Sequence, residues 1–185
     1  GDNVRPTRLD ATALYSGIVV DTKNFNVSAG VRTFDAAAYL RRAGADPVLV
    51  RTLFQSDYET TVSLARAKAN AVYYPGGLIV GCIPDLLPNG QIIAAQAADG
   101  MLRVDGVRMS IYVFPLARDV VGISARSSGE MNVQVIMEAF GGGGHANVAG
   151  AQVKGVPLDE VRAQVVEQAK AYIEESDQRE SDTAG

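Results

Sequence analysis

AFGGGGHANVAGAQV, residues 139–153, is the stretch on which the interpretation of this 185-residue chain depends. Four consecutive glycines stand directly before His145, which is the only histidine, and apolar residues lie on both sides. Each glycine loses much chain entropy when it becomes ordered, so a folded domain needs a gain in return for such a run. Glycines allow the backbone to approach another group closely, and residues 150–154 after them have strand composition. The stretch therefore predicts backbone held close to a bound group beside a β-strand.

Short β-favouring runs and helical patterns alternate on both sides of this stretch. Apolar runs bounded by Gly, Pro and Asp predict strands at residues 71–74, 77–84, 108–116 and 119–127. Apolar periodicity predicts helices at residues 91–104, 132–140 and 158–174, although Gly100 weakens the first of them. The chain from about residue 57 onward therefore has the pattern of a complete α/β unit.

The front of the chain has helical patterns but too few strands to form a domain alone. We expect a helix at residues 7–20, capped by Thr7 or Asp10, and a second at residues 34–43, capped by Thr33. A third helix starts at Asp46 and Pro47, and a fourth covers residues 57–71. We therefore expect three parts: the end of a larger domain at residues 1–56, a second domain at 57–175, and a polar, disordered tail at 176–185.

Composition restricts the classes of function. With 47% apolar residues the chain can form a core, and its net charge of −4 argues against a protein that grips long nucleic acid through its phosphates. Cys82 is the sole cysteine, so an internal disulfide and a cysteine-based zinc site are excluded. No run of about 18 apolar residues predicts a membrane span, and no signal-peptide core is present. We expect a cytoplasmic location, with any membrane anchor of a longer parent outside this chain.

Polar groups gather within twenty residues of the glycine run. Arg126 follows a predicted edge strand, Ser127 and Ser128 add hydroxyls, and a guanidinium can bind a phosphate through two hydrogen bonds. His145 can donate to a phosphate oxygen when protonated. A mobile glycine turn and an ordinary polar histidine are the alternatives, but the coincidence of these features favours an anion site. The spacing is neither that of a P-loop nor that of GxGxxG.

The segment SSGEMNVQVIMEAFGGGGHANVAGAQV, residues 127–153, resembles the substrate-binding motif of the DHH phosphoesterase superfamily, in its DHH-associated C-terminal domain. That motif joins an Arg and an Asn to Gly-Gly-Gly-His and a run of small residues. The resemblance implies a catalytic role for His145 in orienting phosphate oxygens. It also implies nucleotide and phosphate contacts from Arg126, Asn132, Gly142, Gly143, Gly144 and His145.

A second segment, SGIVVDTKNF, places Asp21 between an apolar helix and a polar turn. The pattern by itself favours an Asx-turn aspartate and leaves a metal ligand open. The segment resembles the fourth motif of the DHH domain, which implies that Asp21 binds a centre of two Mn²⁺ ions. The family's Asp-His-His triplet is absent from these residues. The resemblance therefore implies a fragment that lacks most metal ligands and is inactive alone.

Residues 8–174 together are most similar to the PAS–GGDEF–DHH-type cyclic di-AMP phosphodiesterases. The implied fold is α/β: the helical end of a DHH domain, then a mixed-sheet DHH-associated domain with flanking helices. The implied activity of the parent is hydrolysis of cyclic di-AMP to linear pApA by two-metal catalysis. An oligoribonuclease or 3′-phosphoadenosine phosphate phosphatase and a non-catalytic nucleotide-binding module remain alternatives, and a homodimer stays open.

Overall fold

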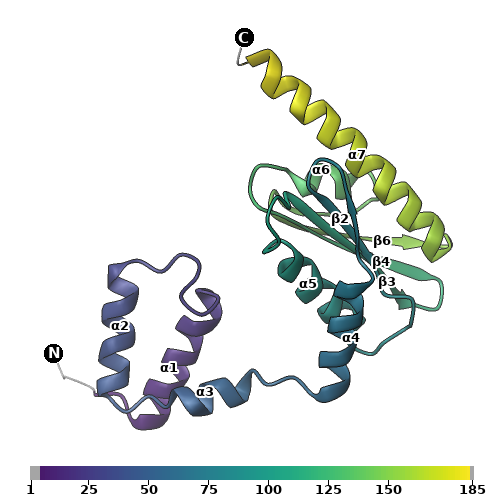
Figure 1. The fold of residues 1–185 in the computed structure, drawn as a ribbon. Helices are drawn as coiled ribbons and strands as arrows, with labels where there is room; N and C mark the ends of the chain where they lie inside the picture. The colour runs from purple at the N-terminus through teal and green to yellow at the C-terminus, as the bar shows by residue number, and fades with distance from the viewer. Residues whose placement is uncertain (1–4, 184–185) are drawn as a thin grey trace. The chain divides into compact units, whose positions relative to one another are not determined.

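The computed structural model describes residues 5–183, and the chain divides into two compact units (Figure 1). Unit 1 comprises residues 1–56 and unit 2 comprises residues 57–185. Each unit has buried apolar clusters of its own.

Unit 1 contains α1 (Arg8–Asp21), α2 (Val31–Arg42) and α3 (Pro47–Leu53). Thr7 and Asp10 form a reciprocal capping box at the start of α1, and Asp46 caps α3. The N-cap of α2 is Gly30, so the prediction of Thr33 was wrong: the helix starts earlier and the amide of Thr33 donates to the Gly30 carbonyl.

Unit 2 is built on a six-stranded mixed sheet in the order β1-β2-β3-β4-β6-β5. Neighbouring strands are antiparallel except β2 and β3, which are parallel and joined by a crossover through α5. The strands are β1 (Val72–Tyr74), β2 (Leu78–Cys82), β3 (Met109–Ala117), β4 (Val120–Ser127), β5 (Gly143–His145) and β6 (Val148–Lys154). The helices are α4 (Tyr58–Ala69), α5 (Gly90–Met101), α6 (Val133–Glu138) and α7 (Leu158–Thr183).

Helices cover both faces of the sheet. Figure 1 shows α4 and α5 on one face and α6 and α7 on the other. Alternate residues of β3 pack against the helices of the two faces, because successive side chains of a strand point to opposite faces. Ile111 and Val113 belong to the cluster under α6 and α7, whereas Tyr112 and Phe114 belong to the cluster under α5.

The strand that carries Arg126 is not at the edge of the sheet, and that prediction was wrong. β4 pairs with β3 on one side and with β6 on the other. The reason is that the strand predicted at residues 150–154 begins at Val148 and lies between β4 and the edge. The last two glycines of the run and His145 form the edge strand β5.

The end of the chain also differs from its prediction. Residues 176–185 were expected to be disordered, but α7 continues through Thr183. Asp177 binds Arg108 at 2.7 Å, which attaches the polar extension to the start of β3. Arg179 pairs with Glu175 one turn away at 3.4 Å, which further supports the helical conformation.

Candidate functional site

Arg126 and His145 lie in one row across three strands. Arg126 of β4 is opposite Val148 of β6, and Val148 is opposite His145 of β5. Directly opposed residues of antiparallel strands point to the same face, so the guanidinium and the imidazole extend from the same side of the sheet. Two strand spacings separate their backbones, roughly 10 Å. The imidazole is exposed, so both groups are placed to meet one ligand on this face.

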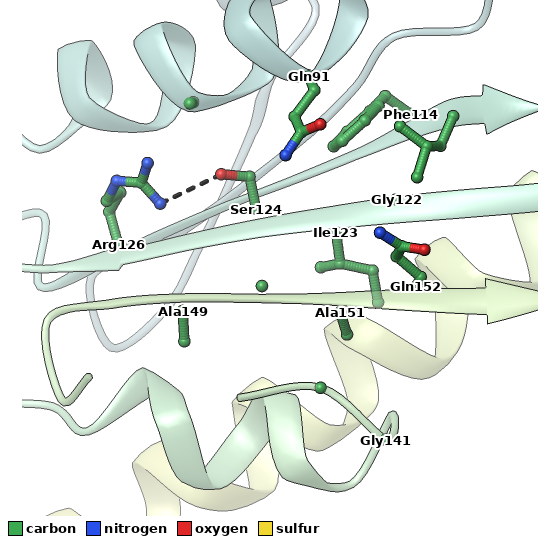
Figure 2. A pocket seen from close by; sticks show the side chains of 14 residues that line it. Gln91, Phe114, Gly122, Ile123, Ser124, Arg126, Gly141, Ala149, Ala151 and Gln152 are labelled. Carbon is green, nitrogen blue, oxygen red and sulfur yellow. Dashed lines mark hydrogen bonds between the residues drawn. The ribbon is translucent and has the colours of Figure 1, made fainter. Parts of the chain in front are cut away.

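Protein contacts hold the guanidinium of Arg126 in place. Its Nη1 donates to the Ser124 hydroxyl at 3.2 Å (Figure 2) and to the Ala125 carbonyl at 2.9 Å. Its Nε lies 3.4 Å from an Asp99 carboxylate oxygen. The side chain is only 12% exposed. A guanidinium that is already oriented and partly desolvated loses less entropy when it binds an anion, and its attraction for that anion is less screened.

A cavity of about 510 Å³ opens beside Arg126, a volume within the usual range for a small-molecule site. It lies among α5, β3, β4, β6 and the turn that precedes β5 (Figure 2). Among the described residues that line it, Arg126 is the only charged one. The lining includes Gln91, Ala95, Phe114, Leu116, Gly122, Ser124, Arg126, Gly142, Gly150 and Gln152. Arg126 is therefore the one cationic group among the described lining residues, and the Asp99 carboxylate beside it offsets part of its charge, which favours a ligand with a single anionic group at that position.

The glycines before His145 serve two different purposes. A Cβ at Gly142 would overlap the Gly150 carbonyl and Ala151, and a Cβ at Gly144, where φ is +147°, would overlap the Val148 carbonyl. These two glycines let β5 lie against β6. A Cβ at Gly143 would meet nothing within 4 Å. Gly143 pairs with Gly150 on the Arg126 face, so its missing side chain keeps that face open.

Asn132 is the N-cap of α6. Its Oδ1 accepts a hydrogen bond from the Gln134 amide at 3.1 Å, and its own amide donates to the Tyr172 hydroxyl at 3.1 Å. The next amide, that of Val133, donates to the Ala146 carbonyl in the turn after His145. Asn132 therefore lies beside the β5–β6 turn. The cavity lining includes Arg126 and Gly142 but not Asn132, Gly143, Gly144 or His145.

Asp21 is in unit 1, exposed, at the last position of α1. The three residues from Lys23 to Phe25 follow it in left-handed backbone conformations, with φ of 45°, 60° and 63°. Such conformations are strained for residues other than glycine and occur at functional turns. No cluster of three or more His, Cys, Asp or Glu side chains that could hold a metal exists within residues 5–183. The single carboxylate of Asp21 does not by itself fit a two-metal centre.

Several residues of the cavity were not predicted from the sequence. Ser124 could have been found, because it lies two positions before Arg126 and so shares its face of β4. Asp99 and Gln91 are brought to the site by the packing of α5, which no local pattern reveals. Burial raises the pKa of Tyr112, opposite Ser124 in β3, to about 12.

Comparison with known proteins gives a family match and close relatives. Residues 89–175 match the model of the DHHA1 domain. The chain is 45% identical over 165 residues to the cyclic-di-AMP phosphodiesterase PdeA of Listeria monocytogenes, covering 89% of this chain and 25% of that protein. It is 43% identical over 171 residues to the cyclic-di-AMP phosphodiesterase GdpP of Geobacillus thermodenitrificans, covering 92% and 26%. The chain thus spans about a quarter of the length of these relatives.

A solved structure shares the fold. The exopolyphosphatase-related protein from Bacteroides fragilis superposes with a TM-score of 0.79 at 20% identity, covering 92% of this chain and 52% of that one. The α/β class with a mixed sheet and flanking helices is therefore confirmed. Between residues 5 and 183, no helix has the length and apolar character needed to cross a membrane.

Proposed function

Because residues 89–175 form a DHHA1 domain of the DHH phosphoesterase superfamily, we propose that this chain is the substrate-binding part of a cyclic dinucleotide phosphodiesterase. The proposed reaction is hydrolysis of cyclic di-AMP to linear pApA. The observation that carries the proposal is the row of Arg126 and His145 on one face of the sheet, beside a cavity with one charged lining residue. The relatives named cyclic-di-AMP phosphodiesterases support the choice of substrate.

In this proposal each group has a separate task. Arg126 binds a phosphate of the dinucleotide, and its contacts with Ser124 and Asp99 keep the guanidinium oriented toward the ligand. His145 shares the row of Arg126 on the same face of the sheet and is exposed, and its imidazole orients or stabilises phosphate oxygens. Gly143 lets the ligand approach the backbone of β5.

The resemblance implies two manganese ions, with Asp21 as one ligand. Such ions would activate water and balance the charge that develops on phosphorus. Residues 5–183 do not complete that centre. We therefore propose that the chain hydrolyses the dinucleotide only as part of a longer protein that supplies the other ligands.

The test is kinetic, on the full-length protein. We expect His145→Ala to lower kcat for cyclic di-AMP by about 100-fold, with an unchanged melting temperature because the imidazole is exposed. Arg126→Ala should mainly raise KM. Arg118→Ala, an exposed arginine in the β3–β4 turn, is the matched control and should behave as wild type.

Unchanged kinetics in both site variants would refute the proposed roles. Faster turnover of linear dinucleotides or of 3′-phosphoadenosine 5′-phosphate than of cyclic di-AMP would instead assign the protein to another activity of the superfamily.

A second candidate is a nucleotide-binding module that does not cleave its ligand. The lack of a ligating cluster within residues 5–183 favours it for this chain. Tight binding of cyclic di-AMP by the full-length protein without any hydrolysis, with manganese present, would establish this function in place of the first.

A further inference from the structure

We propose that Gln91 and Gln152 read the edge of a purine base, and prefer adenine, at the end of the cavity remote from Arg126. The inference rests on the proposed function, since it requires that a nucleotide bind in this cavity. It assigns residues that determine base specificity.

The cavity has a charged end and a neutral end, because α5 packs lengthwise along β4. Gly122, Ser124 and Arg126 follow one face of β4, so Gly122 and Arg126 are roughly 13 Å apart. Gln91 and Asp99 share one face of α5 eight residues apart, which is about 12 Å along a helix. Asp99 lies against Arg126, so Gln91 is at the opposite end (Figure 2).

Gln152 reaches that same neutral end from the other side. It is directly opposite Gly122, and Gly122 is opposite Phe114 in β3. Figure 2 shows Phe114 and Gln152 beside Gly122, away from Arg126, and Gln91 between Phe114 and Ser124. Two carboxamides from two elements therefore flank the neutral end of one cavity.

The surface between the two carboxamides suits a flat ring. A Cβ at Gly122 would overlap the ring of Phe114, so this aromatic side chain lies over the strand at that point. Gly150, opposite Ser124, adds bare backbone farther along the cavity, and Leu116 adds an apolar side chain to its lining. Phe114 is only 3% exposed, so most of the apolar contact with a base would come from Leu116 and the bare backbone, and such contact does not depend on the identity of the base. Discrimination must then come from the polar groups at the edge.

The two carboxamides are the groups able to discriminate. Neither makes a hydrogen bond to another residue within the described part of the chain, so their donors and acceptors are available to a ligand. A carboxamide offers one donor and one acceptor side by side, which matches the amino group and ring nitrogen of adenine. Guanine presents two adjacent acceptors on the corresponding edge, which a cation matches better. The cationic lining residue Arg126 is at the other end.

The experiment is calorimetric titration of this chain with AMP, GMP and ribose 5-phosphate. Gln91→Leu and Gln152→Leu remove the hydrogen-bonding groups with little change in size. Each should weaken AMP binding by about fivefold, reduce the preference for AMP over GMP, and leave ribose 5-phosphate binding unchanged. Gln164→Leu, on the exposed surface of α7, is the matched control.

The outcomes separate this inference from the function on which it rests. If AMP and ribose 5-phosphate bind, both depend on Arg126, and the glutamine variants bind AMP as wild type does, the base-reading role is wrong and the nucleotide site stands. A preference of the wild-type chain for GMP would also overturn the base-reading role alone. If neither ligand binds, or if Arg126→Ala has no effect, both the inference and the proposed site are overturned.

Discussion

At the scale of single residues, the environment of Arg126 decides what the cavity can bind. The sequence indicated this arginine and the histidine, because both stand in a pattern that resembles a known motif. It could not indicate Asp99, which lies 27 positions earlier and meets the guanidinium only through the packing of α5. It did place a helix start at Asn132, but it gave no sign that this residue lies beside the turn after His145.

The glycines give the sharpest test at this scale. Gly142→Ala should lower the free energy of unfolding by about 1–3 kcal/mol, because the new methyl group overlaps β6. Gly143→Ala should leave stability unchanged or raise it slightly, because its methyl group meets nothing and the unfolded chain loses freedom. Gly143→Ala should nevertheless weaken nucleotide binding, because its methyl group lies on the face of the sheet that carries Arg126. Denaturant unfolding would measure the stability of the two variants, and calorimetry would measure their nucleotide binding.

Equal stability of the two glycine variants would contradict the close approach of β5 to β6. A Gly143→Ala variant that binds nucleotide as wild type does would remove Gly143 from the site.

At the scale of elements, local sequence patterns predicted the helices and strands, except those that form only because of tertiary contacts. Residue type alone predicted Asp46 as a cap and offered Thr7 or Asp10 for the first helix, of which Thr7 is the N-cap. Strand β5 was not, because three residues of mostly glycine have no strand propensity and pair only because β6 is beside them. The continuation of α7 was not predicted either, since its polar residues look like a solvated tail until Arg108 is placed next to them.

The extension of α7 should therefore depend more on the Arg108–Asp177 ion pair than on the more exposed Arg179–Glu175 pair. Asp177→Ala removes a partner of Arg108, whose side chain is only 20% exposed, and should cost about 1–2 kcal/mol of stability. Glu175→Ala, in the same helix with a more exposed pair, should cost less than about 0.5 kcal/mol. Thermal or denaturant unfolding would compare the two, and an equal effect would show that Arg108 does not anchor the helix.

At the scale of the whole molecule, unit 2 holds the cavity and a core of its own, whereas Asp21 belongs to unit 1. The sequence pattern predicted the α/β character of unit 2, because strand and helix periods are local. The order of its strands was not predictable, since the place of β6 between β4 and β5 depends on pairings among distant residues.

The central claim is that the face shared by Arg126 and His145 is a nucleotide site. The most direct measurement is the amide chemical-shift map of this 19.5 kDa chain titrated with cyclic di-AMP. We predict shifts that concentrate at residues 122–126, at Gly142 to His145 and around Gly150, and that vanish in Arg126→Ala. Shifts confined to α7 on the opposite face, or a spectrum that cyclic di-AMP leaves unchanged, would contradict the claim.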